Sequence, residues 1–216
     1  MITVENQLFS LHTRHTSYLF RVMETGHLEH LYYGRKIHPA IDGLMEQHAF
    51  APGNTNIYDS EHLQFSLEDA CLEMSSFGKG DIREPFVELT LSDGSETSDF
   101  LFEKFEQGTG KEEFETLPGS YDESGEVEWL GVTLRDKNSG VILELHYYVY
   151  EDCDVITRSA KLINESGDVV KLNRLMSLQL DLEPSDYVFT TFRRGWAREM
   201  GRTDVRLVPG KYVNAS

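Results

Sequence analysis

The chain of 216 residues carries a formal net charge of -17, with 39% hydrophobic and 26% charged residues. This hydrophobic fraction allows a packed core and argues against wholesale disorder, and the length allows one large all-β domain or two small ones. The negative charge repels phosphate backbones and anionic membranes, so we expect neither nucleic-acid nor membrane binding.

The first residues and the cysteines together predict a cytoplasmic location. Residues 1–15 lack the apolar run of a signal peptide, and no segment approaches the roughly 18 apolar residues of a membrane span. Cys71 and Cys153 form no CxxC pair and are too few for a disulfide framework. We therefore expect a soluble protein of a reducing compartment.

Alternation of apolar and polar residues, typical of half-buried strands, recurs along the whole chain. The strands that it predicts are 5–12, 17–22, 28–33, 86–91, 128–134, 141–150, 154–162 and 172–182. Turn signals separate them: residues 13–16, Asp93-Gly94, residues 136–140 and residues 164–168. The last of these turns predicts that 154–162 pairs with 172–182, and in that second strand Met176, Leu178, Leu180 and Leu182 would face inward.

Three segments depart from this pattern. Ser66 precedes apolar residues at helical spacing, and Asp69 stands three residues later, where a capping box would place it, so we predict a short helix. The segment 39–64 shows no periodicity and is long enough to be a functional loop. The acidic segment 103–126 is interpreted as a solvated loop and edge strand. Overall the pattern predicts a mostly β fold, a large sandwich of antiparallel strands with few short helices.

Phosphate-loop and metal patterns fail when they are examined residue by residue. In the segment 78–85, Arg83 stands where the third glycine of a dinucleotide loop would be, and no Gly-Lys-Ser/Thr follows, so we expect a tight turn locked by Asp81 and Arg83. His12/His15 and His27/His30 are spaced to point to opposite faces of a strand. No acid–base pair stands out, and we expect no metal and no cofactor.

The two tryptophans lie in different surroundings. Trp129 falls within a strand pattern and is interpreted as a core or edge packing residue. Trp196 is surrounded by basic residues, Arg193, Arg194, Arg198, Arg202 and Arg206. A flat ring beside planar guanidinium groups suits a ligand with C–H groups on one face and hydroxyls on an edge. The alternative on composition alone is a core tryptophan with surface arginines.

Five groups of segments, in order along nearly the whole chain, resemble the N-terminal domain of family 36 glycoside hydrolases. They are 9–13 with 17–20 and 26–35, 65–67 with 78–85, 117–121, 154–160 with 175–178, and 195–199. The resemblance implies a β-supersandwich that precedes a (β/α)8 barrel. It also implies a parent α-galactosidase that hydrolyses terminal α-linked galactose with retention, as in melibiose and raffinose, using two aspartates of that barrel.

The resemblance also implies how far this chain reaches into such an enzyme. Residues 1–216 would form an N-terminal domain that stops before the sandwich is complete and before the catalytic barrel. No catalytic residue is then expected in this chain. We predict that the 216 residues alone hydrolyse no α-galactoside.

The resemblance further implies two places of sugar contact. Trp196 matches the family's tryptophan near the substrate in Gly-Trp-x-Arg-Glu, and Arg198 lies in the same motif. The family's Asp and Arg in the long loop would fall near Gln47 and Leu63, where the pattern departs; the nearest candidates are Asp59 and His62.

Three functions follow from these observations. The first is the non-catalytic part of an α-galactosidase, which shapes the pocket for α-galactoside oligosaccharides and assembles a homo-oligomer through the loop 39–64. The second is a free-standing carbohydrate-binding module. The third is a purely structural β-sandwich module.

Overall fold

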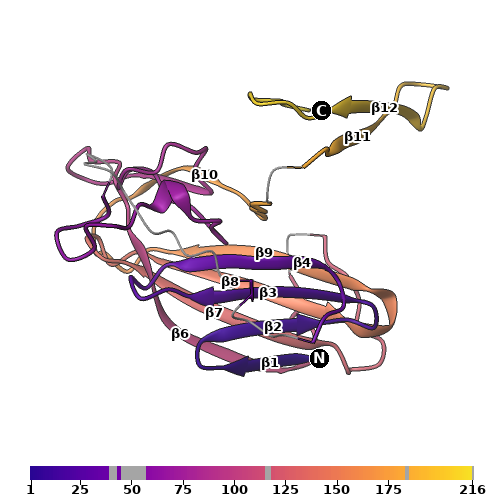
Figure 1. Cartoon of the computed structure of the whole chain (residues 1–216), viewed down its shortest axis with the longest axis horizontal. Coiled ribbons are helices and arrows are strands. Elements are labelled where there is room, and N and C mark those ends of the chain that lie inside the picture. Colours follow the sequence, from indigo (N-terminus) through magenta and orange to yellow (C-terminus); the bar gives the residue numbers. More distant parts are fainter. Residues whose placement is uncertain (39–42, 45–56, 115–117, 183–184, 216) are drawn as a thin grey trace. The chain divides into compact units, whose positions relative to one another are not determined.

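The protein is described from a computed structural model, shown in Figure 1. The structure describes residues 1–38, 43–44, 57–114, 118–182 and 185–215. The chain divides into two compact units, Met1–Asp181 and Leu182–Ser216, and each is described by itself. That both belong to one N-terminal domain stays a prediction.

The first unit is built on two four-stranded antiparallel sheets. One contains β1 (Ile2–Glu5), β2 (Leu8–His12), β3 (Thr16–Val22) and β4 (Leu28–Arg35) in that order. The other contains β6 (Phe100–Thr109), β7 (Glu128–Asp136), β8 (Ile142–Tyr150) and β9 (Val155–Ile163), also in chain order. Figure 1 shows the two sheets stacked as the layers of a sandwich, which confirms the predicted fold class.

The core fills the space between these two layers. Phe9 stacks on Phe20 with ring centroids 4.7 Å apart, and Phe20 stacks on Tyr147 of the opposite sheet at 5.2 Å. The predicted inward residues of β7 and β8 are buried, which confirms their alternation; they are Leu130, Val132, Leu134, Leu143, Leu145, Tyr147 and Val149. Burial of these rings and branched side chains provides most of the driving force for folding.

The predicted strand 5–12 is divided in the structure. Asn6 and Gln7 take positive φ values of 49° and 62° and form the turn between β1 and β2. Asparagine tolerates this left-handed conformation better than most residues, so a turn can form without glycine. The first hairpin therefore precedes the predicted one, and β2 and β3 pair as expected.

The predicted pairing of 154–162 with 172–182 is wrong. β10 (Lys171–Leu175) pairs with β5 (Val87–Thr90), and its register shifts between Leu172 and Arg174. The turn at 164–168 specifies that the chain reverses, but it does not specify which strand edge the returning segment meets.

The inward face predicted for 172–182 is also wrong. The strand ends at Leu175, and Met176, Leu178 and Leu182 are exposed, whereas Leu180 packs partly against the core. Without a paired strand, the period of two no longer assigns these side chains to one face.

The predicted helix after Ser66 is likewise wrong. Only a 3-10 turn, η2 (Leu67–Asp69), forms, and the Ser66 side chain makes no capping hydrogen bond. The apolar residues of this segment pack in two separate clusters. Leu67, Ala70 and Leu72 pack with Tyr58, whereas Met74 belongs to the main core. Tertiary burial therefore overrides the local helical spacing. A second 3-10 turn, η3 (Glu151–Cys153), joins β8 to β9.

The second unit contains one antiparallel hairpin of β11 (Val188–Arg193) and β12 (Gly201–Arg206). Phe189 contacts Tyr212 edge-to-face, with ring centroids 5.3 Å apart. In the parts of the chain that the structure describes, no helix has the length and apolar character needed to cross a membrane.

Candidate functional site

The two loop candidates, Asp59 and His62, lie together in one tight turn of the first unit. The Asp59 carboxylate accepts hydrogen bonds from the backbone N–H of Glu61 and of His62, each at 2.9 Å, and from His62 Nδ1 at 2.7 Å. Desolvation alone would raise the pKa of Asp59, but the hydrogen bonds from His62 and Glu61 outweigh it and lower the pKa. Both side chains are partly exposed.

Tyr58 fixes this turn to the sandwich. Its hydroxyl donates to Asp99 at 2.9 Å, and His27 Nε2 lies 3.0 Å from the other carboxylate oxygen of Asp99. Lys79 lies over the Tyr58 ring, with its Nζ 4.7 Å from the centroid. Burial raises the pKa of Tyr58, and the neighbouring Asp99 raises it further.

Trp196 lies in the turn that connects β11 to β12, with Arg198 two residues later. Gly195 and Arg198 close this turn by reciprocal backbone hydrogen bonds of 3.1 and 2.9 Å, and Ala197 between them has a positive φ of 56°. The Trp196 side chain is 98% exposed, and Arg198 is exposed as well. The structure therefore brings these two predicted residues together at the surface of the second unit.

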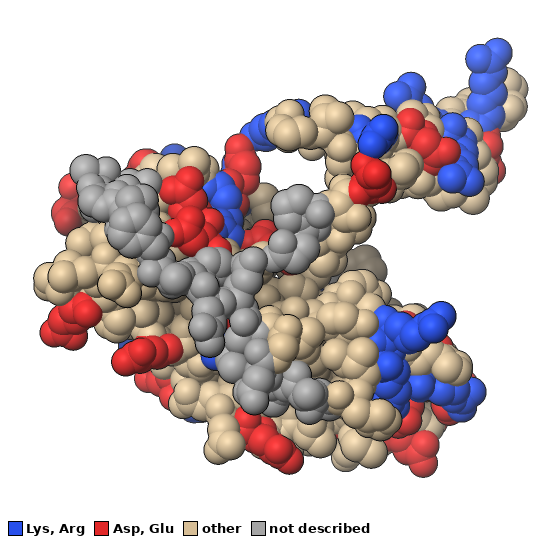
Figure 2. Space-filling view, viewed as in Figure 1, with Lys and Arg blue, Asp and Glu red and all other residues tan. Residues whose placement is uncertain are grey.

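Basic side chains gather on this hairpin, with acidic ones between them (Figure 2). Arg202 Nε donates to Asp204 at 2.9 Å, and Thr190 donates to the same carboxylate at 2.7 Å across the hairpin. Arg206 pairs with Asp186. The contacts of Thr190 with Asp204 and of Asp186 with Arg206 tie the two sides of the hairpin together at the end away from the Trp196 turn.

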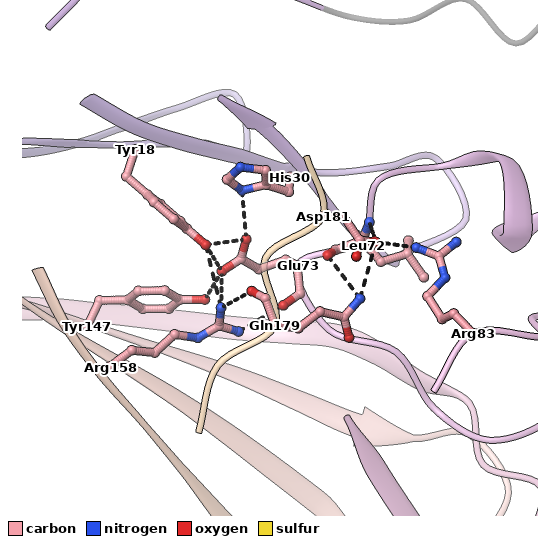
Figure 3. Close-up of polar contacts among 9 residues, drawn as sticks. All are labelled: Tyr18, His30, Leu72, Glu73, Arg83, Tyr147, Arg158, Gln179 and Asp181. Atoms are coloured by element: carbon pink, nitrogen blue, oxygen red, sulfur yellow. Dashed lines mark hydrogen bonds and ion pairs between the residues drawn. The ribbon is translucent and has the colours of Figure 1, made fainter. Parts of the chain in front are cut away.

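A buried carboxylate, Glu73, forms the centre of a polar network inside the first unit (Figure 3). It is completely inaccessible to solvent and pairs with Arg158 at 2.8 Å. Tyr18 and Tyr147 donate their hydroxyls to it at 2.8 and 2.7 Å, and His30 Nδ1 lies 3.2 Å away. The carboxylate is therefore matched by one cation and several donors, as a buried charge requires.

The protonation of this network follows from its surroundings. Burial by itself would raise the pKa of Glu73, but Arg158, His30 and Tyr147 hold that pKa below its ordinary value. Burial raises the pKa values of Tyr18 and Tyr147, so both phenols keep their protons at neutral pH. A carboxylate that is ionised, saturated with donors and closed to solvent is suited to holding the fold rather than to acid–base catalysis.

The network continues to the last residues of the first unit. Arg158 donates to the backbone oxygens of Glu73 and Gln179 at 2.8 and 3.1 Å. Gln179 accepts from Ser75 at 2.8 Å, and the Leu72 backbone N–H donates to Asp181 at 2.9 Å.

Arg83 closes the other end of the network. It pairs with Asp181, and its Nε donates to Asp81 at 2.8 Å, so the predicted locking of this turn by Asp81 and Arg83 is confirmed. The segment 179–181 is thereby held against the sandwich immediately before the second unit begins at Leu182.

Of this network, the sequence predicted only the contact between Asp81 and Arg83. Arg83 and Arg158 stand in segments that resemble the family, but Glu73, Gln179 and Asp181 were missed. One signal was available: Arg158 occupies an inward position of β9 between Ile156 and Ala160, which both pack on the core. A charged residue in that position requires a buried counter-charge.

The histidine pairs do not converge on a common point. His12 contacts Ser17 and His15 contacts Asp154, whereas His27 and His30 reach Asp99 and Glu73. Within the described ranges, no group of three His, Cys, Asp or Glu side chains is placed to hold a metal ion. Neither Cys71 nor Cys153 forms a disulfide bond among the described residues.

Comparison with known proteins identifies this sandwich as a domain of a glycoside hydrolase. Residues 26–216 match the family described as "Glycosyl hydrolase family 36 N-terminal domain", and the chain belongs to this family.

Curated relatives carry the name of one activity. The chain is 30% identical over 204 residues to α-galactosidase AgaA of Geobacillus stearothermophilus, covering 90% of this chain and 27% of that protein. It is 30% identical over 196 residues to α-galactosidase Mel36A of Lactobacillus acidophilus, covering 90% and 27%. The chain therefore spans about a quarter of the length of these relatives.

Solved structures of α-galactosidases share the fold. The enzyme of Lactobacillus brevis superposes with a TM-score of 0.89 at 34% identity, over 96% of this chain and 28% of that one. The family 36 enzyme AgaA of Geobacillus stearothermophilus in complex with raffinose superposes with a TM-score of 0.85 at 30% identity, over 94% and 28%. Another structure of that enzyme contains stachyose.

Proposed function

We propose that this chain is the non-catalytic N-terminal part of an α-galactosidase that acts on oligosaccharides of the raffinose and stachyose type. Family membership supports the class of enzyme, and the relatives solved with raffinose and stachyose support the class of substrate. Within this part, Trp196 contributes to the wall of the sugar pocket, and Arg198 supplies hydrogen-bond donors beside it.

The observation that carries this proposal is the exposure of Trp196. A ring that is 98% exposed in a closed turn contributes almost nothing to the packing of its own unit. Tryptophan is enriched at surfaces that another molecule covers, because it combines a large apolar ring with a polar N–H. An indole face offers the C–H groups of a galactose ring a flat contact, and the guanidinium N–H groups of Arg198 can donate hydrogen bonds to hydroxyls at the ring edge.

The test is a substitution in the full-length enzyme. Trp196→Ala should lower kcat/KM for raffinose by about 1–3 kcal/mol of lost binding, roughly 5- to 150-fold, with an unchanged melting temperature. The matched control is Tyr121→Ala, which removes another aromatic ring that is 87% exposed, but in the first unit. Unchanged kinetics in the Trp196 variant, or equal losses in both variants, would contradict the proposal.

Subunit assembly and location in the cell are the second part of the proposal. The full-length enzyme is a cytoplasmic homo-oligomer, and the loop 39–64 reaches a neighbouring subunit with Asp59 and His62 near the sugar. Most of this loop lies outside the described residues, so the support is the family resemblance and the partial exposure of Asp59 and His62. Sedimentation of the full-length enzyme as a monomer at working concentration would overturn the assembly part.

A further inference from the structure

The outer face of the β6–β9 sheet is hollowed into a groove of about 570 Å³. Its floor follows the register of the strands, whose outward residues stand side by side in three rows. The rows are Gly108, Trp129 and Tyr148; Gly131 and His146 beside Glu106; and Lys104, Thr133, Glu144 and Lys161. Since the alternate residues of these strands fill the core, this face points away from the sandwich interior.

Two glycines leave room for the Trp129 ring to lie on the sheet. A Cβ atom at Gly108 would lie 2.8 Å from the Trp129 Nε1, and one at Gly131 would lie 3.5 Å from Cζ3 at the other end of the indole. The ring therefore covers both glycine positions and lines the groove. Tyr148 stands beside it in the register, and the Nζ of Lys111 lies 4.1 Å from the Tyr148 centroid. Tyr148 is buried, with 3% exposure, so the partly exposed ring of Trp129 forms the aromatic part of the floor.

The charges along this groove cancel. It is lined by three lysines and three glutamates, Lys104, Lys111, Lys161, Glu106, Glu112 and Glu144, in a protein whose net charge is -17. Glu144 lies 3.5 Å from Lys161 and 3.4 Å from His146, so a hydrogen-bond acceptor stands between two groups that can donate. Without a net field, the groove favours a neutral ligand with many hydroxyls over a phosphate or a cation.

We propose that this groove is a second sugar-binding site, which takes a neutral hexose unit of an oligosaccharide. The C–H face of the sugar ring stacks on Trp129, and its hydroxyls bind Glu144, His146 and Lys161. The site lies in the first unit and shares no residue with the Trp196 hairpin. One aromatic platform in an open groove gives weak binding, with a Kd on the order of 1–10 mM.

The experiment uses Trp129 itself as the reporter. The chain has two tryptophans, so the Trp196→Phe variant leaves Trp129 as the single source of indole fluorescence. Titration with raffinose should give a saturable change in emission, and glycerol at the same mass concentration should not. In that background, Glu144→Gln should weaken the binding about fivefold or more, because it removes a charged acceptor.

A matched substitution and a second measurement keep the proposal falsifiable. Glu88→Gln changes a glutamate of the same exposure, 27% against 26%, on β5 outside the groove, and should leave the titration unchanged. In the unsubstituted chain, amide NMR shifts on adding raffinose should include Gly131 and His146.

Two results would overturn the proposal. One is the absence of saturation up to about 100 mM raffinose together with unmoved amides at these positions. The other is an equal titration in the Glu144→Gln variant. The kinetic test of Trp196 concerns the other tryptophan, so either proposal can fail without the other.

Discussion

Replacing Arg158 with methionine should expose how strongly the buried network depends on its cation. The side chains of Arg158 and Glu73 are 6% and 0% exposed and pair at 2.8 Å. Methionine fills a similar volume but carries no charge, so the variant leaves Glu73 in the core without a counter-charge. The backbone oxygens of Glu73 and Gln179 also lose their guanidinium donor.

The expected loss in the free energy of unfolding at neutral pH is about 3–5 kcal/mol, which is typical when one partner of a buried ion pair is removed. Tyr18, Tyr147 and His30 still contact the carboxylate, which favours the lower part of that range. The double variant Glu73→Gln/Arg158→Met removes the uncompensated charge and should recover part of the loss.

Urea unfolding followed by far-UV circular dichroism measures this loss. The control is Arg174→Met, because Arg174 is 33% exposed and pairs with Glu84 and Glu88 at the surface. That surface pair should contribute about 0–1 kcal/mol. A loss below about 1 kcal/mol in Arg158→Met, or an equal loss in both variants, would refute the assignment of the network as a structural anchor.

The pH dependence of the free energy of unfolding provides an independent test of this explanation. In the native chain the pKa of Glu73 lies below its ordinary value of 4.5, so its stabilisation is present above pH 4.5 and is lost as the pH falls through the native pKa. In Arg158→Met, burial dominates and raises that pKa, so the penalty at pH 7 is relieved on acidification. The stability difference between the two proteins should therefore narrow from pH 7 towards about pH 5, and a constant difference would contradict this explanation.

Two further predictions concern turns of the first unit. The hydrogen bond from His15 lowers the pKa of Asp154 from 3.8 to about 2, so the stabilisation by this carboxylate is complete above about pH 4 and is lost towards pH 2. Asparagine suits the positive φ of 53° at this position. In Asp154→Asn, the melting temperature should therefore depend less on pH between pH 4 and pH 2. Gly78→Ala should cost about 2 kcal/mol or more in urea unfolding, because φ is +95° and the new Cβ would lie 2.7 Å from Thr97 Cγ2. Gly94→Ala, with φ +84° and nothing within 4 Å, should cost only the backbone strain of about 1 kcal/mol, and equal costs at both glycines would exclude the steric reason.

Local patterns predicted most strands correctly, because alternation and turn chemistry depend on neighbouring residues. The runs at 128–134 and 141–150 form β7 and β8, and the turn between them lies at the expected residues. Strands of this kind can be predicted from the sequence because their alternation depends only on the burial of one side of the strand. Where burial divides between two clusters, as after Ser66, the same logic predicted a helix that does not form.

Strand partners and the buried network depended on long-range contacts. The residues of β10 do not specify whether the strand pairs with the edge of β9 or with the edge of β5, so the predicted pairing with β9 was wrong. Glu73 lies 85 residues before Arg158 and 74 before Tyr147 along the chain. Pairing of β8 with β9 places Tyr147 beside Arg158, and only tertiary packing brings Glu73, which lies outside the strands, against them. The local pattern of the sequence does not specify such a long-range contact.

The sequence by itself determined the class of fold, the family resemblance and the candidate residues Trp196 and Arg198. The tertiary structure decided that the Trp196 ring stands open in a turn, because closure of the β11–β12 hairpin turns it away from the strands. It also decided that Trp129 lines a groove with three charges of each sign. The registers of four strands place two charges of each sign on one face, and the segment after β6 adds Lys111 and Glu112. Alternation assigns a residue to a face, but only the pairing of strands determines which residues share that face as neighbours.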